Sequence, residues 1–200
     1  MTVSTLILEL ARSIGILRSR DVQAHVGGSY RVALSTLSRQ GKLIRVGRGL
    51  YALPDHNDAG HASLAAIAIK YPHAVFCLLT ALQIHALGTQ SPHEVWIAVA
   101  NKARAPRLDY PPLRVTRFSG DALVFGVTKI AVDGRPVPVT SVAKTIADCF
   151  KYRNKIGLDV ALEALRDAWR SKRVTMDELA EAARVCRVAN VMRPYLESMV

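Results

Sequence analysis

The feature that most constrains this chain is a glycine-marked turn between two short apolar runs near residue 50. Residues 43–46 and 50–53 each have the composition of a β-strand, and Gly47-Arg48-Gly49 between them suits a tight turn. Pro54 ends the second run, because proline has no N–H group with which to continue a ladder of hydrogen bonds. This pattern predicts a β-hairpin that carries an arginine at its tip.

Three short helices are expected ahead of this hairpin. They lie between three pairs of starting and terminating residues: Ser4 and Gly15, Ser19 and Gly27, and Ser29 and Gly41. The third helix has one apolar face, on which Tyr30, Ala33, Leu34 and Leu37 recur at helical spacing. Three helices followed by a hairpin predict a winged helix-turn-helix domain over residues 1–54, in which the third helix enters the major groove of DNA.

The charge of the chain is concentrated in the same segment. The whole chain has a net charge of +11, and residues 1–54 contain eight basic side chains against two acidic ones, a net charge of +6. Such a concentration favours a polyanionic partner, because basic side chains that neutralise phosphates release condensed counterions. The predicted DNA contacts lie on the outer face of the third helix and on the hairpin: Ser29, Arg31, Ser35, Thr36, Ser38, Arg39, Arg45 and Arg48.

These candidates have two expected roles. Arg45 and Arg48, on the hairpin, are expected to position the protein on phosphates. Arg31 and Arg39, on the helix, are better placed for base contacts, since a guanidinium group can read guanine through two hydrogen bonds. The alternative is that the winged module mediates protein contacts and that its arginines form an ordinary solvated face.

A second domain is expected over residues 60–200, after a polar linker at 55–60. Strands are predicted at 75–78, 94–99, 114–117, 123–132 and 137–139, and helices at 62–71, 80–87 and beyond residue 140. Asp133-Gly134 marks a hairpin turn. The predicted fold class is α+β, in which the winged helix-turn-helix precedes a mixed α/β domain with a small sheet and a helical carboxyl-terminal half.

A basic loop is predicted between two strands of that domain. Lys102, Arg104 and Arg107 lie among three prolines, which prevent regular structure over residues 101–112. This loop is a possible additional contact for nucleic acid, and an ordinary solvated connection is the equally simple alternative.

The motifs of common catalytic and metal sites are missing from the sequence. Cys77, Cys149 and Cys186 are far apart in apolar surroundings, which indicates buried thiols, and the six histidines are scattered. No lysine follows Glu94 at the spacing that a metal-dependent nuclease uses, and no Walker or nucleophile-elbow motif is present. We therefore expect no enzyme activity, no cofactor and no metal ion. Lys144 and Asp148 are interpreted as an i, i+4 helix pair.

The sequence also lacks a long apolar run and a leader pattern at its amino end, so a cytoplasmic protein without a membrane partner is expected.

Four segments, in this order, resemble the AbiEi family, the antitoxin component of AbiE type IV toxin–antitoxin systems in bacteria. They are RQGKLIRVGRGLYALP (39–54), LLTALQIHALG (78–88), EVWIAV (94–99) and VPVTSVAKTIADCF (137–150). The resemblance implies a transcriptional repressor whose amino-terminal domain binds inverted repeats of double-stranded DNA in its own promoter. It also implies a carboxyl-terminal domain that counters a nucleotidyltransferase-like toxin without forming a stable complex with it.

Two other functions are weighed against this autoregulatory antitoxin. One is a transcriptional regulator whose second domain senses a small ligand, for which a pocket with convergent polar groups would be expected. The other is a nucleic-acid-processing enzyme, which would cleave its substrate with the help of a metal ion.

Overall fold

The computed structural model describes residues 2–54, 59–108, 111–132 and 135–199, and it has an α+β fold. The chain divides into two units, Met1–Pro72 with Ile130–Val137 and His73–Lys129 with Pro138–Val200. Residues 55–58 of the expected linker and the expected turn at Asp133-Gly134 lie outside the described residues. The domain boundary after residue 54 stays a prediction.

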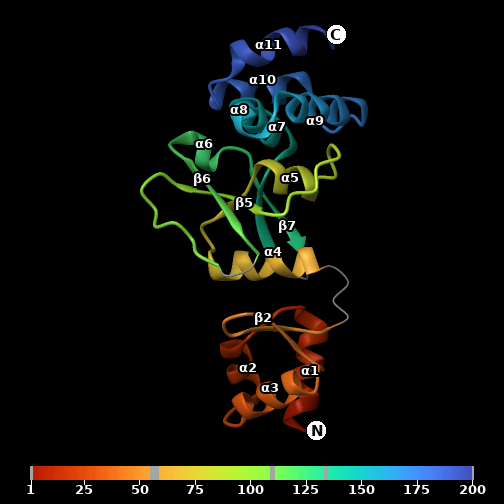
Figure 1. Ribbon diagram of the computed structural model, residues 1–200, viewed down its shortest axis with the longest axis vertical. Coiled ribbons are helices and arrows are strands. Elements are labelled where there is room, and N and C mark those ends of the chain that lie inside the picture. The colour runs from red at the N-terminus through yellow and green to blue at the C-terminus, as the bar shows by residue number, and fades with distance from the viewer. Residues whose placement is uncertain (1, 55–58, 109–110, 133–134, 200) are drawn as a thin grey trace. The chain divides into compact units, whose positions relative to one another are not determined.

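The first unit begins with the helices and hairpin that the sequence predicts (Figure 1). Its elements are α1 (Val3–Ile14), β1 (Leu17–Arg18), α2 (Ser19–Val26), α3 (Tyr30–Arg39), β2 (Ile44–Gly47), β3 (Leu50–Ala52) and α4 (Ala59–Lys70). The three strands form one antiparallel sheet in the order β1-β3-β2. A winged helix-turn-helix arrangement, with one short extra strand, is therefore present.

Helix amphipathicity explains the core of this unit. Each of the first three helices turns its apolar stripe inward, so that the side chains remove one another from water. The buried cluster consists of Ile7, Ala11, Leu17, Val22, Tyr30, Leu34, Leu37 and Leu43. Because α3 contributes one face to this cluster, its opposite face is left for solvent or a partner.

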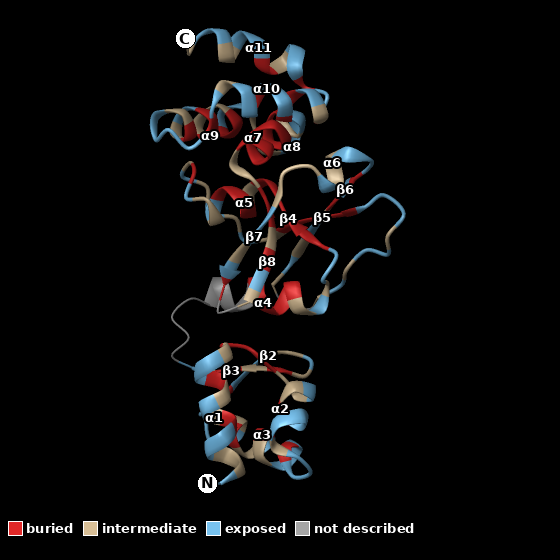
Figure 2. Ribbon diagram, turned by 180° about the vertical axis from the view of Figure 1, so that it is seen from behind, coloured by how far each residue is buried: buried red, intermediate tan, exposed pale blue. Residues whose placement is uncertain are grey.

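The second unit combines a mixed sheet with a helical carboxyl-terminal part (Figure 2). The strands of the five-stranded sheet are β4 (Val75–Phe76), β5 (Val95–Ala100), β6 (Leu113–Phe118), β7 (Val127–Val132) and β8 (Arg135–Thr140), in the order β6-β5-β4-β8-β7. Residues 130–137 of the last two strands are grouped with the first unit. The helices are α5 (Leu78–Ile84), α6 (Asp121–Val124), α7 (Val142–Lys151), α8 (Arg153–Ile156), α9 (Leu158–Arg170), α10 (Met176–Val185) and α11 (Ala189–Glu197).

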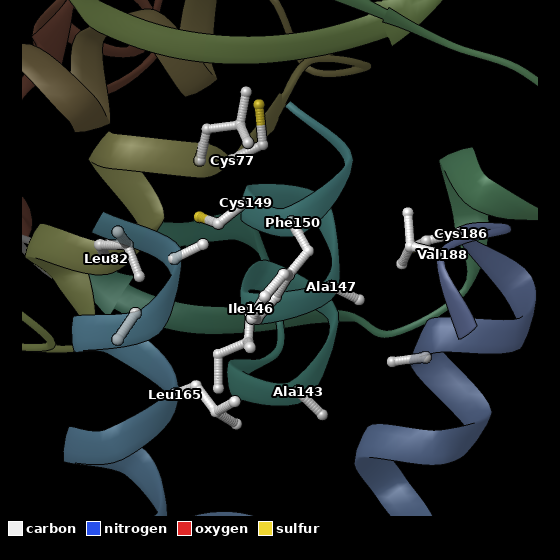
Figure 3. Packing of buried hydrophobic residues seen from close by; sticks show 14 of the residues in the cluster. Cys77, Leu82, Ala143, Ile146, Ala147, Cys149, Phe150, Leu165, Cys186 and Val188 are labelled. Atoms are coloured by element: carbon white, nitrogen blue, oxygen red, sulfur yellow. The ribbon is translucent and has the colours of Figure 1, made fainter. Parts of the chain in front are cut away.

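Helix α7 is the centre of the second core. Its residues from Ala143 to Phe150 are all buried, and the cluster around them includes side chains of α5, α9 and α10. Figure 3 shows α7 side chains between Leu82 and Leu165 on one side and Cys186 and Val188 on the other. All three cysteines are free and buried, as the sequence indicates.

Several expected element boundaries are wrong, each for a local reason. Helix α1 begins one residue before Ser4 and is capped by the side chain of Thr2. Helix α5 begins at Leu78 rather than at Thr80, because the Thr80 hydroxyl accepts a hydrogen bond from the backbone N–H of Trp96 instead of capping a helix.

Other differences concern whole elements. The expected strand at 123–132 is a short helix, α6, followed by β7, since Gly126 has a positive φ of 61° that interrupts extended backbone. Strand β1 has no counterpart among the expected elements, whereas helix α11 lies in the carboxyl-terminal half that is expected to be helical. Helix α4 begins at residue 59, inside the expected linker.

Candidate nucleic-acid interface

Helix α3 presents a polar outer face opposite its buried stripe. Ser29, Arg31, Ser35 and Arg39 are exposed, while Thr36 and Ser38 are partly buried at the edge of that face. The side chain of Ser29, at the N-cap, makes no capping hydrogen bond. Val32 is 70% exposed on the same side of the helix and could contact a thymine methyl group. The face thus offers donors, short hydroxyls and one apolar side chain, the residue types that contact DNA.

The β2–β3 hairpin forms a wing with both of its arginines in solvent. Arg45 pairs with Tyr51, and the register shifts between Arg45 and Gly47, so the hairpin contains an irregularity just before its tip. Arg45 and Arg48 are exposed, whereas Leu50 is buried and Tyr51 packs against the core cluster. The two guanidinium groups therefore project from an anchored strand pair.

The tip of the wing is fastened to α2, a contact that the sequence pattern did not indicate. The backbone N–H of Ser19, at the start of α2, donates to the carbonyl oxygen of Gly49 at 2.9 Å. The hydroxyl of Ser19 approaches the same oxygen at 3.3 Å. In addition, β1 pairs with β3, placing Arg18 opposite Leu50. These contacts set the position of the wing relative to the helices.

The electrostatics of this surface are uniform in sign. Residues 22–54 contain no aspartate or glutamate, so neither α3 nor the wing includes a carboxylate. The acidic residue of α2, Asp21, already lies near three guanidinium groups, those of Arg18 at 4.0 Å, Arg20 at 3.9 Å and Arg135 at 3.3 Å. The arginines of α3 and the wing therefore face solvent without a competing anion among the described residues.

The basic loop of the second unit has a defined beginning. One guanidinium nitrogen of Arg117, on β6, donates to the carbonyl oxygens of Ala100 at 3.2 Å, Asn101 at 2.8 Å and Ala103 at 2.8 Å. Lys102, Arg104 and Arg107 follow from this anchored turn, and all three side chains are exposed. The sequence-predicted residues thus fall into two groups, one in each unit.

A buried ion pair is the most unusual polar feature of the second unit. Lys144 and Asp148 are 0% and 1% exposed, and their charged groups are in direct hydrogen-bond contact. The lysine Nζ lies 4.5 Å from the ring centroid of Phe118, and the thiol of Cys186 donates to the other carboxylate oxygen at 3.3 Å. Burial raises the pKa of Asp148. The charge of Lys144 acts in the opposite direction but is the smaller effect, so the pKa stays above its ordinary value. The expected i, i+4 pair exists, but it lies in the core rather than on a solvated helix face.

A crevice of about 440 Å³ opens near the start of α7. Most of its polar side chains already take part in internal hydrogen bonds. His85 donates from Nε2 to the carbonyl oxygen of Thr140 at 2.7 Å, and Arg173 donates to the carbonyl oxygen of His85. Glu178 completes a capping box with Thr175. The crevice consequently presents few polar groups that a small ligand could satisfy.

Within the described part of the chain, no three histidine, cysteine or acidic side chains gather closely enough to hold a metal ion. No helix there combines the length and apolar character needed to cross a membrane.

Comparison with known proteins adds one family and one fold. Residues 5–54 match the family described as transcriptional regulator, AbiEi antitoxin. No curated protein matches the chain. The structure resembles the crystal structure of the RV2827C protein from Mycobacterium tuberculosis, with a TM-score of 0.55 and 12% sequence identity. That match covers 98% of this chain and 81% of the other, and at such low identity it indicates a common fold alone.

Proposed function

We propose that the chain binds double-stranded DNA through α3 and the β2–β3 wing, and the match of residues 5–54 to the family described as transcriptional regulator, AbiEi antitoxin, supports this. Helix α3 would lie in the major groove, and the wing would follow the phosphate backbone. The observation that carries this proposal is the absence of any carboxylate from residues 22–54, which contain the exposed Arg31, Arg39, Arg45 and Arg48. This arrangement suits a phosphate-rich partner better than a protein surface of mixed charge.

The wing offers the sharpest test of this proposal. We expect the Arg45→Ala/Arg48→Ala double variant to bind both promoter and random duplexes more weakly. Its slope of log affinity against log salt should be smaller by about 2, since each phosphate contact contributes about one unit. Fluorescence anisotropy with labelled duplexes at several salt concentrations measures both quantities.

The matched control removes the same charge from the second unit. Arg166 and Arg170 are exposed on α9, outside the proposed interface. The Arg166→Ala/Arg170→Ala variant should keep the parent's salt slope. If the wing variant binds both duplexes as the parent does at every salt concentration, the wing has no role in DNA binding.

We further propose that the DNA target is a set of inverted repeats in the chain's own promoter, and that binding represses a type IV toxin–antitoxin operon in the cytoplasm. The second unit would counter a nucleotidyltransferase-like toxin without a stable complex. The family match over residues 5–54 supports the regulatory part of this proposal. Co-expression with the neighbouring gene tests the rest: growth should be restored by the parent chain, and an absence of rescue would contradict the antitoxin role.

The two alternatives gain less support. A ligand-sensing regulator needs free polar groups in a pocket, and the crevice near α7 has most of its polar groups engaged internally. A nucleic-acid-processing enzyme needs reactive side chains that a substrate can reach, whereas the Lys144–Asp148 pair is fully buried. We therefore propose a binding function rather than catalysis. The exposed loop with Lys102, Arg104 and Arg107 is proposed as an additional nucleic-acid contact.

A further inference from the structure

Arg31 differs from the other arginines of the proposed interface because a neighbouring aromatic residue restrains it. Its Nε donates a hydrogen bond to the hydroxyl oxygen of Tyr30 at 3.0 Å. The guanidinium carbon also lies 5.7 Å from the centroid of the Tyr30 ring. The hydrogen bond that Arg31 donates to Tyr30 raises the pKa of Arg31. Arg39, at the other end of α3, has no hydrogen-bond or ion-pair partner within the described residues.

The restraint continues into α2. Tyr30 is 6% exposed and belongs to the apolar core, so its ring is fixed in place. Its hydroxyl donates to the side-chain oxygen of Gln23, on α2, at 3.2 Å. Gln23 itself is exposed and has no place in the core. The chain of contacts therefore runs from α2 through a core aromatic to an arginine at the amino end of α3.

The geometry determines which part of Arg31 is left for a partner. With Nε engaged by Tyr30, the two terminal nitrogens remain available as a parallel pair of donors. Such a pair matches the O6 and N7 acceptors of guanine end-on. Arg31 is the second residue of α3, and residues near the amino end of a recognition helix are those that contact base edges.

We propose that Tyr30 is a positioning residue that holds Arg31 for end-on recognition of one guanine in the DNA target. This proposal rests on the proposed DNA-binding function and assigns different roles to Arg31 and Arg39. Arg31 supplies sequence preference because it is oriented before binding, whereas Arg39 must lose its side-chain freedom when DNA binds.

The Tyr30→Phe variant tests the proposal, because it removes the hydroxyl and keeps the buried ring. Orienting one flexible side chain in advance is worth about 0.5–1.5 kcal/mol, so we expect roughly two- to tenfold weaker binding to a promoter duplex. Binding to a random duplex should not change. Single base-pair substitutions across the promoter duplex should show relaxed preference at one position, the same position at which Arg31→Ala loses discrimination.

A double-variant comparison separates positioning from a merely structural effect. Adding Tyr30→Phe to Arg31→Ala should have no further effect on promoter binding, while adding it to Arg39→Ala should weaken binding as much as it does in the parent. Gln23→Ala is a second probe, since it removes the anchor of the hydroxyl from an exposed site and should relax preference at the same base pair.

The results that would overturn the proposal are distinct from those that would overturn DNA binding itself. If Arg31→Ala loses base preference but Tyr30→Phe and Gln23→Ala do not, Arg31 acts without the restraint. If Tyr30→Phe weakens binding equally with and without Arg31, its effect is structural. If the parent chain binds neither duplex, the proposed function fails, and the inference fails with it.

Discussion

Lys144 and Asp148 are two opposite charges that are removed from water together. Each ion would be costly to bury alone, and their contact, the ring of Phe118 and the thiol of Cys186 offset that cost. A pair of this kind is sensitive to the loss of one member, because the remaining charge stays in the core without a partner.

We therefore predict that Lys144→Met lowers the free energy of unfolding by roughly 3–5 kcal/mol. Lys151, exposed at the end of the same helix, provides the control, and Lys151→Met should change stability by no more than about 0.5 kcal/mol. Urea unfolding of both variants measures the difference. Equal midpoints for the two variants would show that the buried pair contributes nothing specific.

His85 gives the second unit a dependence on pH. Burial lowers the pKa of its imidazole below the ordinary value of 6.5, and the charge of Arg173 lowers it further. Between the two pKa values the unfolded chain binds more protons than the folded chain does. The contribution of neutral His85 is therefore complete above pH 6.5 and is lost as the pH falls below that value.

His85→Gln tests this expectation, because glutamine can still donate to the carbonyl oxygen of Thr140 but does not titrate. The parent should exceed the variant in unfolding free energy by the largest margin near pH 8. That margin should narrow as the pH falls from about 6.5, the ordinary pKa of histidine, towards 5. A margin that stays constant over the whole range would mean that His85 does not titrate on unfolding as proposed.

At the scale of elements, the wing combines a positive backbone angle with an exposed turn. Gly49 has a φ of 74°, and an added Cβ atom would meet only the Ser19 hydroxyl oxygen, at an ordinary contact distance of 3.5 Å. A substitution at Gly49 is therefore disfavoured by the backbone conformation and not by a clash with neighbouring atoms, since residues with a side chain rarely adopt the left-handed region.

We predict that Gly49→Ala lowers the unfolding free energy by about 1–2 kcal/mol and weakens binding to all duplexes alike. Gly28→Ala is the matched control, because the φ of Gly28 lies outside the left-handed region and an added Cβ atom would have open space around it. It should leave stability unchanged or raise it slightly. Thermal unfolding measures the stability of both variants, and anisotropy measures their affinity for duplexes. If the two variants have the same stability and the same affinity, the backbone conformation of Gly49 does not constrain the wing.

The elements that the sequence predicts well are those with a clear period or a clear turn. The stripe of Tyr30, Leu34 and Leu37 indicates α3, and the glycine-flanked arginine indicates the wing. Strand β1 has only two residues, too few for any period, and its formation depends on pairing with β3. Helix α6 lies in an apolar run that is equally compatible with a strand until Gly126 is considered.

At the scale of the whole molecule, contacts between residues far apart in the sequence could not be predicted from the sequence. Asp21 and Arg135 are 114 positions apart, yet both belong to the first unit and form an ion pair. Likewise, the burial of Lys144 follows from the packing of α7 among other helices, not from the i, i+4 spacing itself. The exposed candidates on α3 were identifiable because helical periodicity assigns them to the outer face, and Arg48 on the wing was identifiable because glycines flank it in a predicted turn.

Hydrogen exchange of the full chain, with and without promoter duplex, tests most directly whether α3 and the wing form the DNA-binding surface. We predict that DNA slows exchange at backbone amides of Tyr30–Arg39 and Ile44–Ala52, while amides of α9 in the second unit exchange as before. If exchange in α3 and the wing is unchanged at duplex concentrations that saturate binding, the proposed interface is contradicted.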